Sequence, residues 1–340
     1  MTKKTSFLIF KVIFFLGLGV FFIWIFVRKL KPEEIDQIFS YIKNANYWWL
    51  VLAFLIGVLS HYARSVRFVI MLETMDYKPK VINAFYAVMV GYLANLAVPR
   101  LGEVLRCTFL KRYENIPFQK SFGVVITERA IDMLVFAILL FIAFTIEFER
   151  INGYVTKNIF APFTEKFGSM AGSFTLYSFL AFCIIIIIAW WFLRKKLRKS
   201  SLYLKIEHVF VGFWEGIISV GKLKRPYLFL FHTALIWFSY FFMTYVCFFA
   251  FDGLAHLSPK VAFVCLVFGT FAFMLVQGGI GLYPLIITGT LSLYGISETL
   301  GSAAGWVGWS IQEVLILIVG FLSLILASLN SKKDEKIRNN

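Results

Sequence analysis

The sequence predicts an all-α integral membrane protein with about six full spans and two re-entrant or broken helical hairpins. The 340-residue chain is 60% hydrophobic and only 16% charged, whereas soluble domains are nearer half apolar and a quarter charged. About eight apolar segments recur along it. Two of them follow breaks that contain Pro or Gly and are too short to cross a bilayer, which indicates hairpins.

Charge and cysteine usage narrow the class further. The net charge of +15 is compatible with nucleic-acid binding, but most of the 34 Lys and Arg lie in short loops beside apolar runs. That distribution is typical of cytoplasmic membrane edges, so no nucleic-acid partner is predicted. The four cysteines lie in or beside apolar segments without metal-ligand spacing, which favours buried, inert thiols. They are Cys107, Cys183, Cys247 and Cys265.

The chain begins with a span, an interfacial helix and a second span. Residues 7–27 form an apolar run that is long for a signal peptide and lacks a following small-residue cleavage site, so a retained span is favoured over a secretory signal. Residues 31–44 carry apolar side chains at helical spacing, which predicts an interfacial helix. The second span opens at the aromatic run 47–49 and reaches about Ala63.

The remaining apolar segments follow in order, with one basic loop between them. They are residues 81–97, 101–112, 121–146, 172–193, 227–250, 261–276, 282–293 and 303–329. The loop 194–225 includes an amphipathic piece that we expect on the membrane surface. We therefore expect one polytopic membrane domain over residues 1–330, with halves at about 1–150 and 170–330, and a polar cytoplasmic tail at 331–340.

Two of these segments are shorter than a bilayer is thick. Residues 101–112 and 282–293 would each form about 18 Å of helix, against a hydrocarbon core of about 30 Å. One follows Pro99 and the other follows the glycine-rich stretch 277–281. Such breaks are tolerated at depth only where protein or water satisfies the backbone. We predict hairpins that return to their starting side, with an ordinary kinked span as the alternative.

The hairpins fix an orientation. With them, 24 of the Lys and Arg fall on one side of the membrane, 8 on the other and 2 within spans. The positive-inside rule places the richer side, and both termini, in the cytoplasm. Each half then contains two spans, a hairpin and a long span, in opposite orientation, which is an inverted repeat of architecture. Paired broken segments in such halves indicate the binding site of a transporter.

Ionisable residues gather around the first break. Arg100, Glu103 and Arg106 are three residues apart, so Glu103 can brace either guanidinium. A helix that starts at Pro99 directs its first N–H groups into the membrane interior, a place suited to an anion. The planar fork of arginine matches phosphate. The group predicts binding of a lipid phosphate, and the alternative is a set of salt bridges that only locks the hairpin.

A second group of charges lies on the next long segment. Glu128 and Asp132 share a helix face, and Arg129 can reach Asp132. The acid that is less well matched can pair with an arginine of the first hairpin, which we favour, or can titrate and couple transport to protons. Glu313 is a lone acid in the last segment, and we expect it to act as a counter-ion to the first hairpin.

These motifs resemble a known family. N-x-x-x-P-R-x-G-E-x-x-R from Asn95, followed by E-R-x-x-D from Glu128, resembles the lysylphosphatidylglycerol synthase transmembrane family, also called the flippase-like domain. The Arg64/Arg67 pair and the late glycine break fit it along nearly the whole chain. The resemblance implies a bacterial-type inner-membrane protein that translocates, or helps to translocate, lipids with phosphate-containing head groups. With Glu313 added, the candidate substrate-binding residues are Asn95, Arg100, Glu103, Arg106, Arg64, Arg67, Glu128, Arg129, Asp132, Gln277, Gly278, Gly279, Gly281 and Glu313.

Two features depart from the family pattern. Members usually have Pro-Gly-Gly-x-Gly and then an acid at the second break, whereas this chain has Gln277 before the glycines and Tyr283-Pro284 where the acid is expected. The resemblance therefore does not support an acidic role at the outer hairpin. Aminoacylating relatives carry a soluble transferase domain after the membrane part, and this sequence ends without one, so no lysyl transfer is expected.

Lipid translocation is the predicted function, in which a phosphate-containing lipid is moved or bound at a midplane arginine/acid site. An intramembrane enzyme would need a nucleophile, an acid–base set or a metal cluster, and the four histidines lie far apart without such partners. No catalytic residue, metal or cofactor is therefore expected. A non-transporting scaffold or accessory protein for lipid or cell-envelope synthesis is the alternative. Phospholipids and polyprenyl-phosphate lipids are both compatible with an arginine site.

Overall fold

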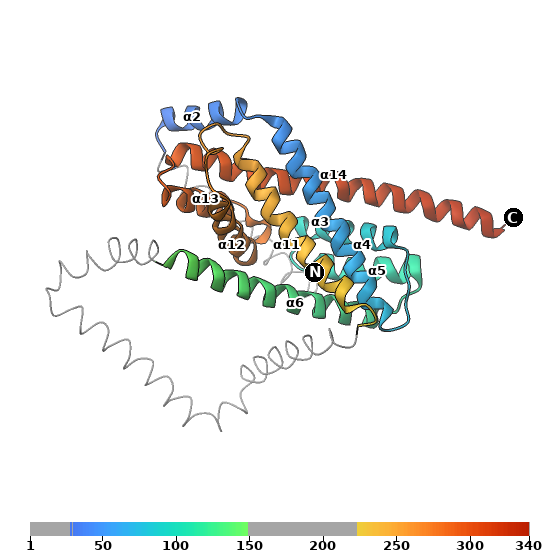
Figure 1. Cartoon of the computed structure of the whole chain (residues 1–340). Helices are drawn as coiled ribbons and strands as arrows, with labels where there is room; N and C mark the ends of the chain where they lie inside the picture. Colours follow the sequence, from blue (N-terminus) through green and yellow to red (C-terminus); the bar gives the residue numbers. More distant parts are fainter. Residues whose placement is uncertain (1–27, 29, 149–222, 340) are drawn as a thin grey trace, which may run out of the picture. The chain divides into compact units, whose positions relative to one another are not determined.

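A computed structural model describes residues 28, 30–148 and 223–339. All regular secondary structure in these ranges is helical (Figure 1). Four of the helices are long and apolar enough to cross a membrane: α3 (Tyr47–Glu73), α6 (Phe118–Ile146), α11 (Pro226–Phe248) and the apolar part, Glu298–Leu329, of α14 (Glu298–Asn339). The predicted all-helical membrane class is thus confirmed, while the number of spans and the inverted repeat stay predictions. The predicted span at 7–27, the segment 172–193 and the loop up to residue 222 lie outside the described residues.

The chain divides into two compact units. One comprises residues 1–129 and 220–340, and the other comprises residues 130–219. Helix α6 (Phe118–Ile146) contributes its first part to the first unit and its remainder to the second. All contacts described below lie within the first unit. The single membrane domain expected over residues 1–330 remains a prediction.

Helix α2 (Pro32–Lys43) is the predicted interfacial helix. Proline occupies its first turn, where a missing N–H costs nothing, and the backbone N–H of Lys31 donates to Glu34 Oε2 at 2.7 Å. Ile38 is buried, while Phe39 is 65% exposed. The helix packs against α14 through its apolar side. An amphipathic helix of this kind suits a position at a membrane surface.

Helix α3 (Tyr47–Glu73) is longer than the sequence predicted. The expected end near Ala63 was wrong, because the helix continues for ten more residues. The two arginines that suggested a membrane edge, Arg64 and Arg67, are instead buried at 4% and 0% exposure. The predicted span ended before these arginines because their shared partner, Glu128, lies more than sixty residues away in the sequence and could not be recognised from it.

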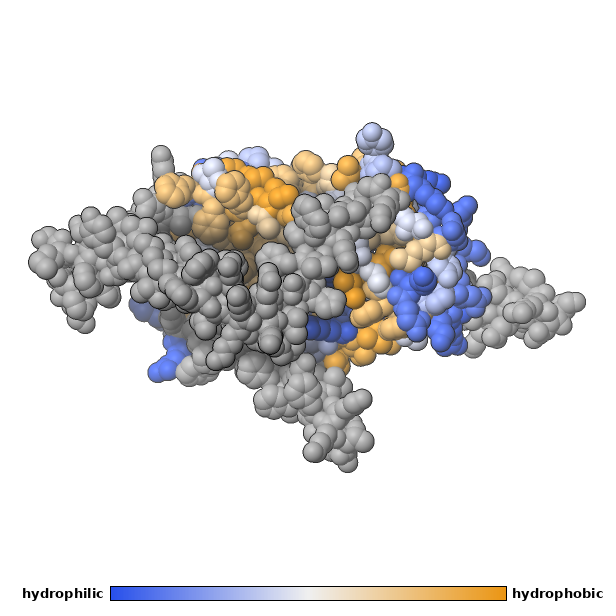
Figure 2. All heavy atoms as spheres, turned by 90° about the horizontal axis from the view of Figure 1, so that it is seen from below, coloured by the Kyte–Doolittle hydropathy of each residue, from blue (hydrophilic) through white to orange (hydrophobic). Residues whose placement is uncertain are grey.

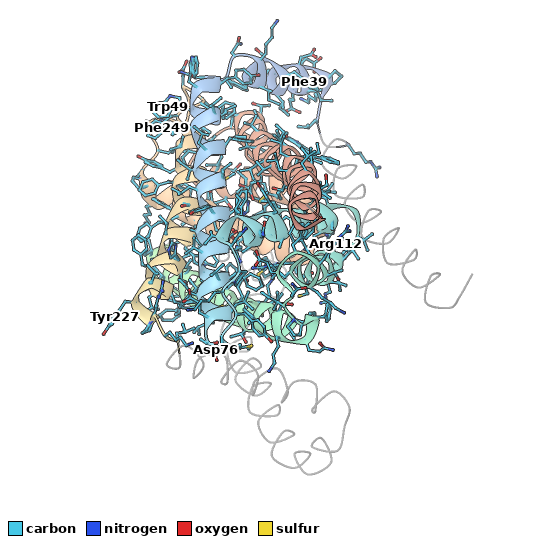
Figure 3. The ribbon with its side chains drawn as sticks, turned by 90° about the vertical axis from the view of Figure 1, so that its right-hand side faces the viewer. Phe39, Trp49, Asp76, Arg112, Tyr227 and Phe249 are labelled. Carbon is cyan, nitrogen blue, oxygen red and sulfur yellow. The ribbon has the colours of Figure 1, made fainter. Side chains whose placement is uncertain are left out.

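Helix α11 (Pro226–Phe248) runs antiparallel beside α3. Figure 3 shows Trp49 and Phe249 together at one end of this pair, with Asp76 and Tyr227 at the other. The Trp49 and Phe249 rings lie 5.1 Å apart. The two ends of this unit therefore differ, one being rich in aromatic rings beside α2 and the other carrying ion pairs.

The ion-paired end joins the loop after α3 to the start of α11. Lys224 Nζ lies 2.6 Å from Asp76 Oδ1, and Arg225 Nε lies 3.6 Å from Glu73 Oε2. The hydrogen bond from Lys224 lowers the pKa of the Asp76 carboxyl. Three of the four side chains are largely exposed, the exception being Glu73 at 13%, so the pairs hold the helix ends in register without contributing much stability.

Helices α4 (Val81–Ala97) and α5 (Leu101–Glu114) form a hairpin. Glu114 Oε1, at the end of α5, accepts hydrogen bonds from Lys80 N at 3.1 Å and Asn83 Nδ2 at 2.6 Å, at the start of α4. The segment therefore folds back on itself, and the alternative of a single kinked helix does not apply to it.

Residues 98–100, called the first break below, separate these two helices. Val98 is extended, and Arg100 has φ 65°, in the left-handed region that non-glycine residues rarely adopt. Helix α5 starts only at Leu101. The sequence suggested that Pro99 occupies the first helical position. Pro99 instead lies in the turn, because Arg100 is the N-cap residue that precedes the helix.

Helices α12 (Pro259–Leu275) and α13 (Leu282–Ser292) form a second broken pair, joined through the one-turn helix η2 (Gln277–Gly279). Residues 276–281 are called the second break. They again start from an extended valine, and three glycines have positive φ: Gly278, Gly279 and Gly281. The helices approach closely at Gly269, where a Cβ atom would lie 2.6 Å from the Tyr283 ring.

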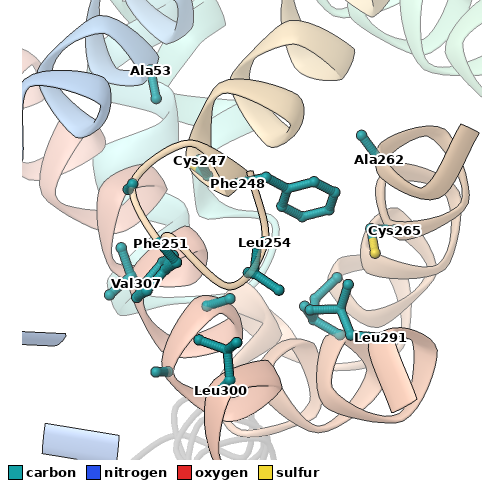
Figure 4. Close-up of a cluster of buried hydrophobic side chains, with 14 of the residues drawn as sticks. Ala53, Cys247, Phe248, Phe251, Leu254, Ala262, Cys265, Leu291, Leu300 and Val307 are labelled. Atoms are coloured by element: carbon teal, nitrogen blue, oxygen red, sulfur yellow. The ribbon is translucent and has the colours of Figure 1, made fainter. Parts of the chain in front are cut away.

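The core of the first unit is built where the second broken pair meets α3, α11 and α14 (Glu298–Asn339). Figure 4 shows side chains from α3, α11, α12, α13 and α14 converging, with Leu254 from the intervening turn among them. Outside this core many large apolar side chains are exposed, and Figure 2 shows hydrophobic residues gathered on the face drawn. A water-soluble protein rarely exposes so much apolar surface, whereas a bilayer covers it.

Candidate functional site

Three arginines surround Glu128 in the first unit. Arg64 Nη1 lies 2.9 Å and Arg67 Nη2 lies 3.2 Å from Glu128 Oε1, and Arg106 Nη1 lies 2.9 Å from Oε2. All four side chains are at most 6% exposed. We call these four residues the arginine–glutamate cluster. Its formation confirms the expectation that an acid of α6 pairs across helices with an arginine of the first hairpin.

Neutral side chains from α11 complete the surroundings of two of these arginines. Arg64 Nη2 donates to the Tyr240 hydroxyl at 3.3 Å, and Arg67 Nη1 donates to Thr233 Oγ1 at 3.4 Å. Sequence reasoning missed both partners because they carry no charge. Their spacing of seven residues, which places them on one helix face, was the available signal.

Arg106 is held differently. Its guanidinium lies flat on the Phe68 ring, with Cζ 3.6 Å from the ring centroid. Nη1 faces Glu128, while Nε and Nη2 have no hydrogen-bond partner among the described residues. Nε–H and the adjacent Nη2–H form one planar fork, the geometry that binds two oxygens of a carboxylate or phosphate. A buried fork without acceptors is costly, so an acceptor is expected there.

A small, partly open cleft lies beside Arg106. Its lining comes from α4, α5 and α6: Val88, Gly91, Tyr92, Asn95, Gly102, Glu103, Arg106 and Arg129. Glu103 Oε1 lies 3.4 Å from Arg129 Nη2, and its Oε2 is buried without a hydrogen-bond partner in the described part of the chain. Glu103 therefore pairs with Arg129 rather than bracing Arg100 or Arg106, because α6 lies across its face of α5.

Gly102 has a packing role that the motif alone did not reveal. A Cβ atom there would collide with the Gly91 carbonyl and lie 2.7 Å from Asn95 Cγ. Asn95 Oδ1 also accepts the backbone N–H of Gly102 at 2.7 Å, which satisfies a free donor in the first turn of α5. The glycine and the asparagine of the motif thus close the hairpin beside the cleft.

The two breaks are connected. Gln277 Nε2 donates to the carbonyl oxygen of Asn95, and Trp309 Nε1 donates to the carbonyl oxygen of Gly278 at 2.7 Å. A Cβ atom on Gly278 would lie 3.7 Å from Glu313 Oε1. Glu313 therefore lies against the second break, and it forms no ion pair with the first hairpin in the described part of the chain. The expectation that it acts as a counter-ion to the first hairpin finds no support in these contacts.

The remaining predicted residues are found at the start of α5, on α6 and in the second break. Arg100 is exposed at the start of α5 and does not line the cleft. Asp132 is partly buried on α6 and belongs to the second unit. Gly279 and Gly281 shape the second break through positive φ.

Groups of His, Cys, Asp and Glu suited to a metal ion are absent from the described ranges. The cysteines within these ranges, Cys107, Cys247 and Cys265, are buried and free. Burial and separation are what the sequence predicted for them, and Cys183 lies outside the described residues.

Fold and site together define a multi-pass helical membrane protein with a buried arginine–glutamate cluster beside a broken hairpin. The chain belongs to the family described as the lysylphosphatidylglycerol synthase TM region, whose family model matches residues 8–325. Among curated proteins, it is similar to the UPF0104 membrane protein MJ1595 of Methanocaldococcus jannaschii, with 27% identity over 156 residues. That match covers 45% of this chain and 43% of the relative, so less than half of the relative's length is spanned. No solved structure matches the chain.

Proposed function

We propose that the chain translocates a membrane lipid with a phosphate-containing head group, and that the cleft beside Arg106 receives the phosphate. One observation carries the proposal: the Nε/Nη2 fork of Arg106 is buried, lies over the Phe68 ring and has no acceptor among the described residues. A phosphate supplies two oxygens at the spacing of that fork. Lysine could not make the same contact, because its ammonium is a point charge.

The charge around the cleft supports an anionic ligand. Arginines outnumber glutamates in the cluster and the cleft lining, which hold Arg64, Arg67, Arg106 and Arg129 beside Glu103 and Glu128. Ionisable groups within a bilayer are costly and mark functional sites. A lipid phosphate, which the membrane itself supplies, would bring a negative charge to the fork of Arg106.

Access to Arg106 requires the Glu103–Arg129 pair to part. This pair is long, at 3.4 Å, and its side chains are 23% and 42% exposed, so it is the weakest ion pair at the site. A phosphate oxygen that replaces Glu103 at Arg129 would bring the head group beside Arg106. Arg64 and Arg67, whose Nη atoms contact Glu128 and neutral α11 partners, brace the site and do not touch lipid in this proposal.

The membrane orientation also belongs to this proposal. We place the chain in a cytoplasmic membrane with its ion-paired end, which includes Lys78, Lys224 and Arg225, facing the cytoplasm. The two broken pairs support an inverted repeat, since each has a 17-residue helix, an extended valine and a residue at positive φ. The proposed chemistry is binding and movement of a lipid, without catalysis.

Reconstitution into vesicles tests the function. The probe is phosphatidylglycerol with a fluorescent acyl chain, and dithionite added outside reduces only the probe in the outer leaflet. Vesicles with the wild-type chain should lose fluorescence beyond the outer-leaflet fraction, because inner-leaflet lipid reaches the reductant. A parallel arm with a fluorescent polyprenyl phosphate compares the two lipid classes.

Variants of Arg106 separate transport from scaffolding. Arg106→Lys should slow probe movement and Arg106→Ala should slow it further, since the fork is lost in both. Lys78→Gln, which removes a surface charge away from the cleft, is the matched control and should move lipid at the wild-type rate. Fluorescence loss equal to that of protein-free vesicles for both probes would instead favour a non-transporting scaffold or accessory protein.

A further inference from the structure

Glu313 is an acidic side chain at the middle of a membrane-spanning stretch. The apolar part of α14 runs from Glu298 to Leu329, so Glu313 lies fifteen residues from one end and sixteen from the other. At 1.5 Å per residue it is about 23 Å from either end, near the midplane of a bilayer. A carboxylate at this depth is costly unless something neutralises it.

The described part of the chain supplies no cation to Glu313. Helices α2, α3, α4, α11 and α13 all pack against α14. Their basic residues lie elsewhere, because Arg64 and Arg67 point at Glu128 and Lys43 ends the interfacial helix α2. In the described part of the chain, the other titratable side chains within the apolar parts of these helices form no hydrogen bond to Glu313: His61, Tyr62, Tyr86, Tyr92, His232, Tyr240, Tyr245, Cys247 and Tyr283.

The second break lies directly beside this carboxylate. A Cβ atom on Gly278 would be 3.7 Å from Glu313 Oε1, and Trp309, one turn earlier on α14, donates to the Gly278 carbonyl. The break ends α12, and the last four carbonyl groups of a helix have no partner in the regular helical pattern. The carbonyl oxygens of Val276, Gly278 and Gly281 each accept one hydrogen bond, which leaves each a second lone pair. Carbonyl groups at interrupted membrane helices are the usual ligands of coupling cations in transporters. Acid and carbonyl groups therefore meet at one place.

We propose that Glu313 and the carbonyl groups of the second break form a site for a small monovalent cation, H⁺ or Na⁺, whose uptake is coupled to lipid movement. The coupling rests on the proposed function, whereas the site itself does not. The two sites then take ligands of opposite charge: the fork of Arg106, near the first break, binds an anion, and Glu313, beside the second break, binds a cation. The hydrogen bond from Gln277 to the Asn95 carbonyl joins the two breaks.

Intrinsic fluorescence tests the site without any lipid movement. Trp306, Trp309 and Glu313 are spaced i, i+3 and i+7 on one face of α14, and Trp309 touches the break. Purified protein is titrated with NaCl against KCl at constant ionic strength, and separately from pH 5 to pH 9 in KCl. A shift in emission should occur with Na⁺ if sodium is the ligand, or with pH alone if the proton is.

Three variants assign the response. Glu313→Gln should lose the shift in emission because the ion no longer binds, and Trp309→Phe should lose it because the reporting ring is gone. Glu298→Gln, at the exposed start of the same helix, should keep the wild-type shift. A wild-type protein with no response to either ion would overturn the proposal, as would a Glu313→Gln variant with the wild-type response. Both results would leave the lipid function standing, because fluorescence does not depend on it.

Vesicles then test the coupling. An inward gradient of the ion identified by fluorescence should accelerate movement of the fluorescent lipid in the wild type, and Glu313→Gln should lose that acceleration. Lipid movement that is independent of the gradient would overturn the coupling although lipid translocation remains. Absence of any lipid movement, with the fluorescence response intact, would refute the proposed function and the coupling together but support the cation site.

Discussion

Replacing Glu128 with glutamine should destabilise the protein more than any other single charge removal in the described structure. The substitution keeps the shape of the side chain but leaves Arg64, Arg67 and Arg106 buried around a neutral amide. Breaking a buried ion pair by removing one partner costs about 3–5 kcal/mol, because the remaining charge is left uncompensated. At roughly 2–4 °C per kcal/mol, the thermal midpoint should fall by about 6–20 °C.

The midpoint can be followed by loss of monodisperse protein after heating in detergent. Arg106→Gln should cost less, because Glu128 keeps two arginines and no charge is stranded. Asp76→Asn removes an acid that pairs with Lys224 at the surface, with a side chain 87% exposed, and should leave the midpoint unchanged. If Glu128→Gln and the wild type had the same thermal midpoint, Glu128 would not compensate the buried arginines. The structural role given to Arg64 and Arg67 would then be wrong.

Three further predictions follow from the cleft, the hairpin and the orientation. In a nanodisc titration, Glu103→Gln should tighten binding of fluorescent phosphatidylglycerol about twofold to fivefold, because the carboxylate that competes for Arg129 contributes up to about 1 kcal/mol. Weaker binding would show that Glu103 helps to bind the lipid and does not compete with it. Gly102→Ala should abolish recovery of folded protein by size-exclusion chromatography, whereas Gly123→Ala, with nothing within 4 Å of the new methyl group, should be recovered normally. In intact cells, a cysteine at Ala255 should react with an impermeant maleimide and one at Lys78 should not, and the reverse pattern would contradict the proposed orientation.

The helices and their breaks could be predicted because each leaves a local signal. Hydrophobic runs gave α4 with its observed bounds, and the short segment after Pro99 indicated a hairpin before any contact was known. Two errors share one physical origin. The end of α3 was placed near Ala63, before Arg64, and Glu103 was assigned to Arg100 and Arg106, because the nearest charge in the sequence is not the nearest in space.

The site could be predicted only as a set of charges. Which arginine retains a free fork depends on Phe68 and on the neutral donors and acceptors of α11, and no rule of spacing reveals that. Gly102 was recognised as part of a motif. A glycine is needed there because two backbones approach closely, which only the hairpin geometry reveals. Similarly, Glu313 could be seen as a lone acid, and its place beside Gly278 required the fold.

The opposite charges of the two proposed ligands, a phosphate at Arg106 and a cation at Glu313, predict how lipid movement should respond to a membrane potential. A lipid phosphate that crosses alone carries about one negative charge, so a potential of 100 mV changes its free energy by about 2.3 kcal/mol. A phosphate at Arg106 that crosses together with a cation at Glu313 carries no net charge, so the membrane potential does not change the free energy of its crossing. Imposing 100 mV on vesicles with a potassium gradient and valinomycin should therefore leave the wild-type rate unchanged but alter the rate of Glu313→Gln, up to about 50-fold if the full charge moves in the limiting step. A wild-type rate that follows the potential as steeply as the variant would mean that phosphate and cation do not cross together.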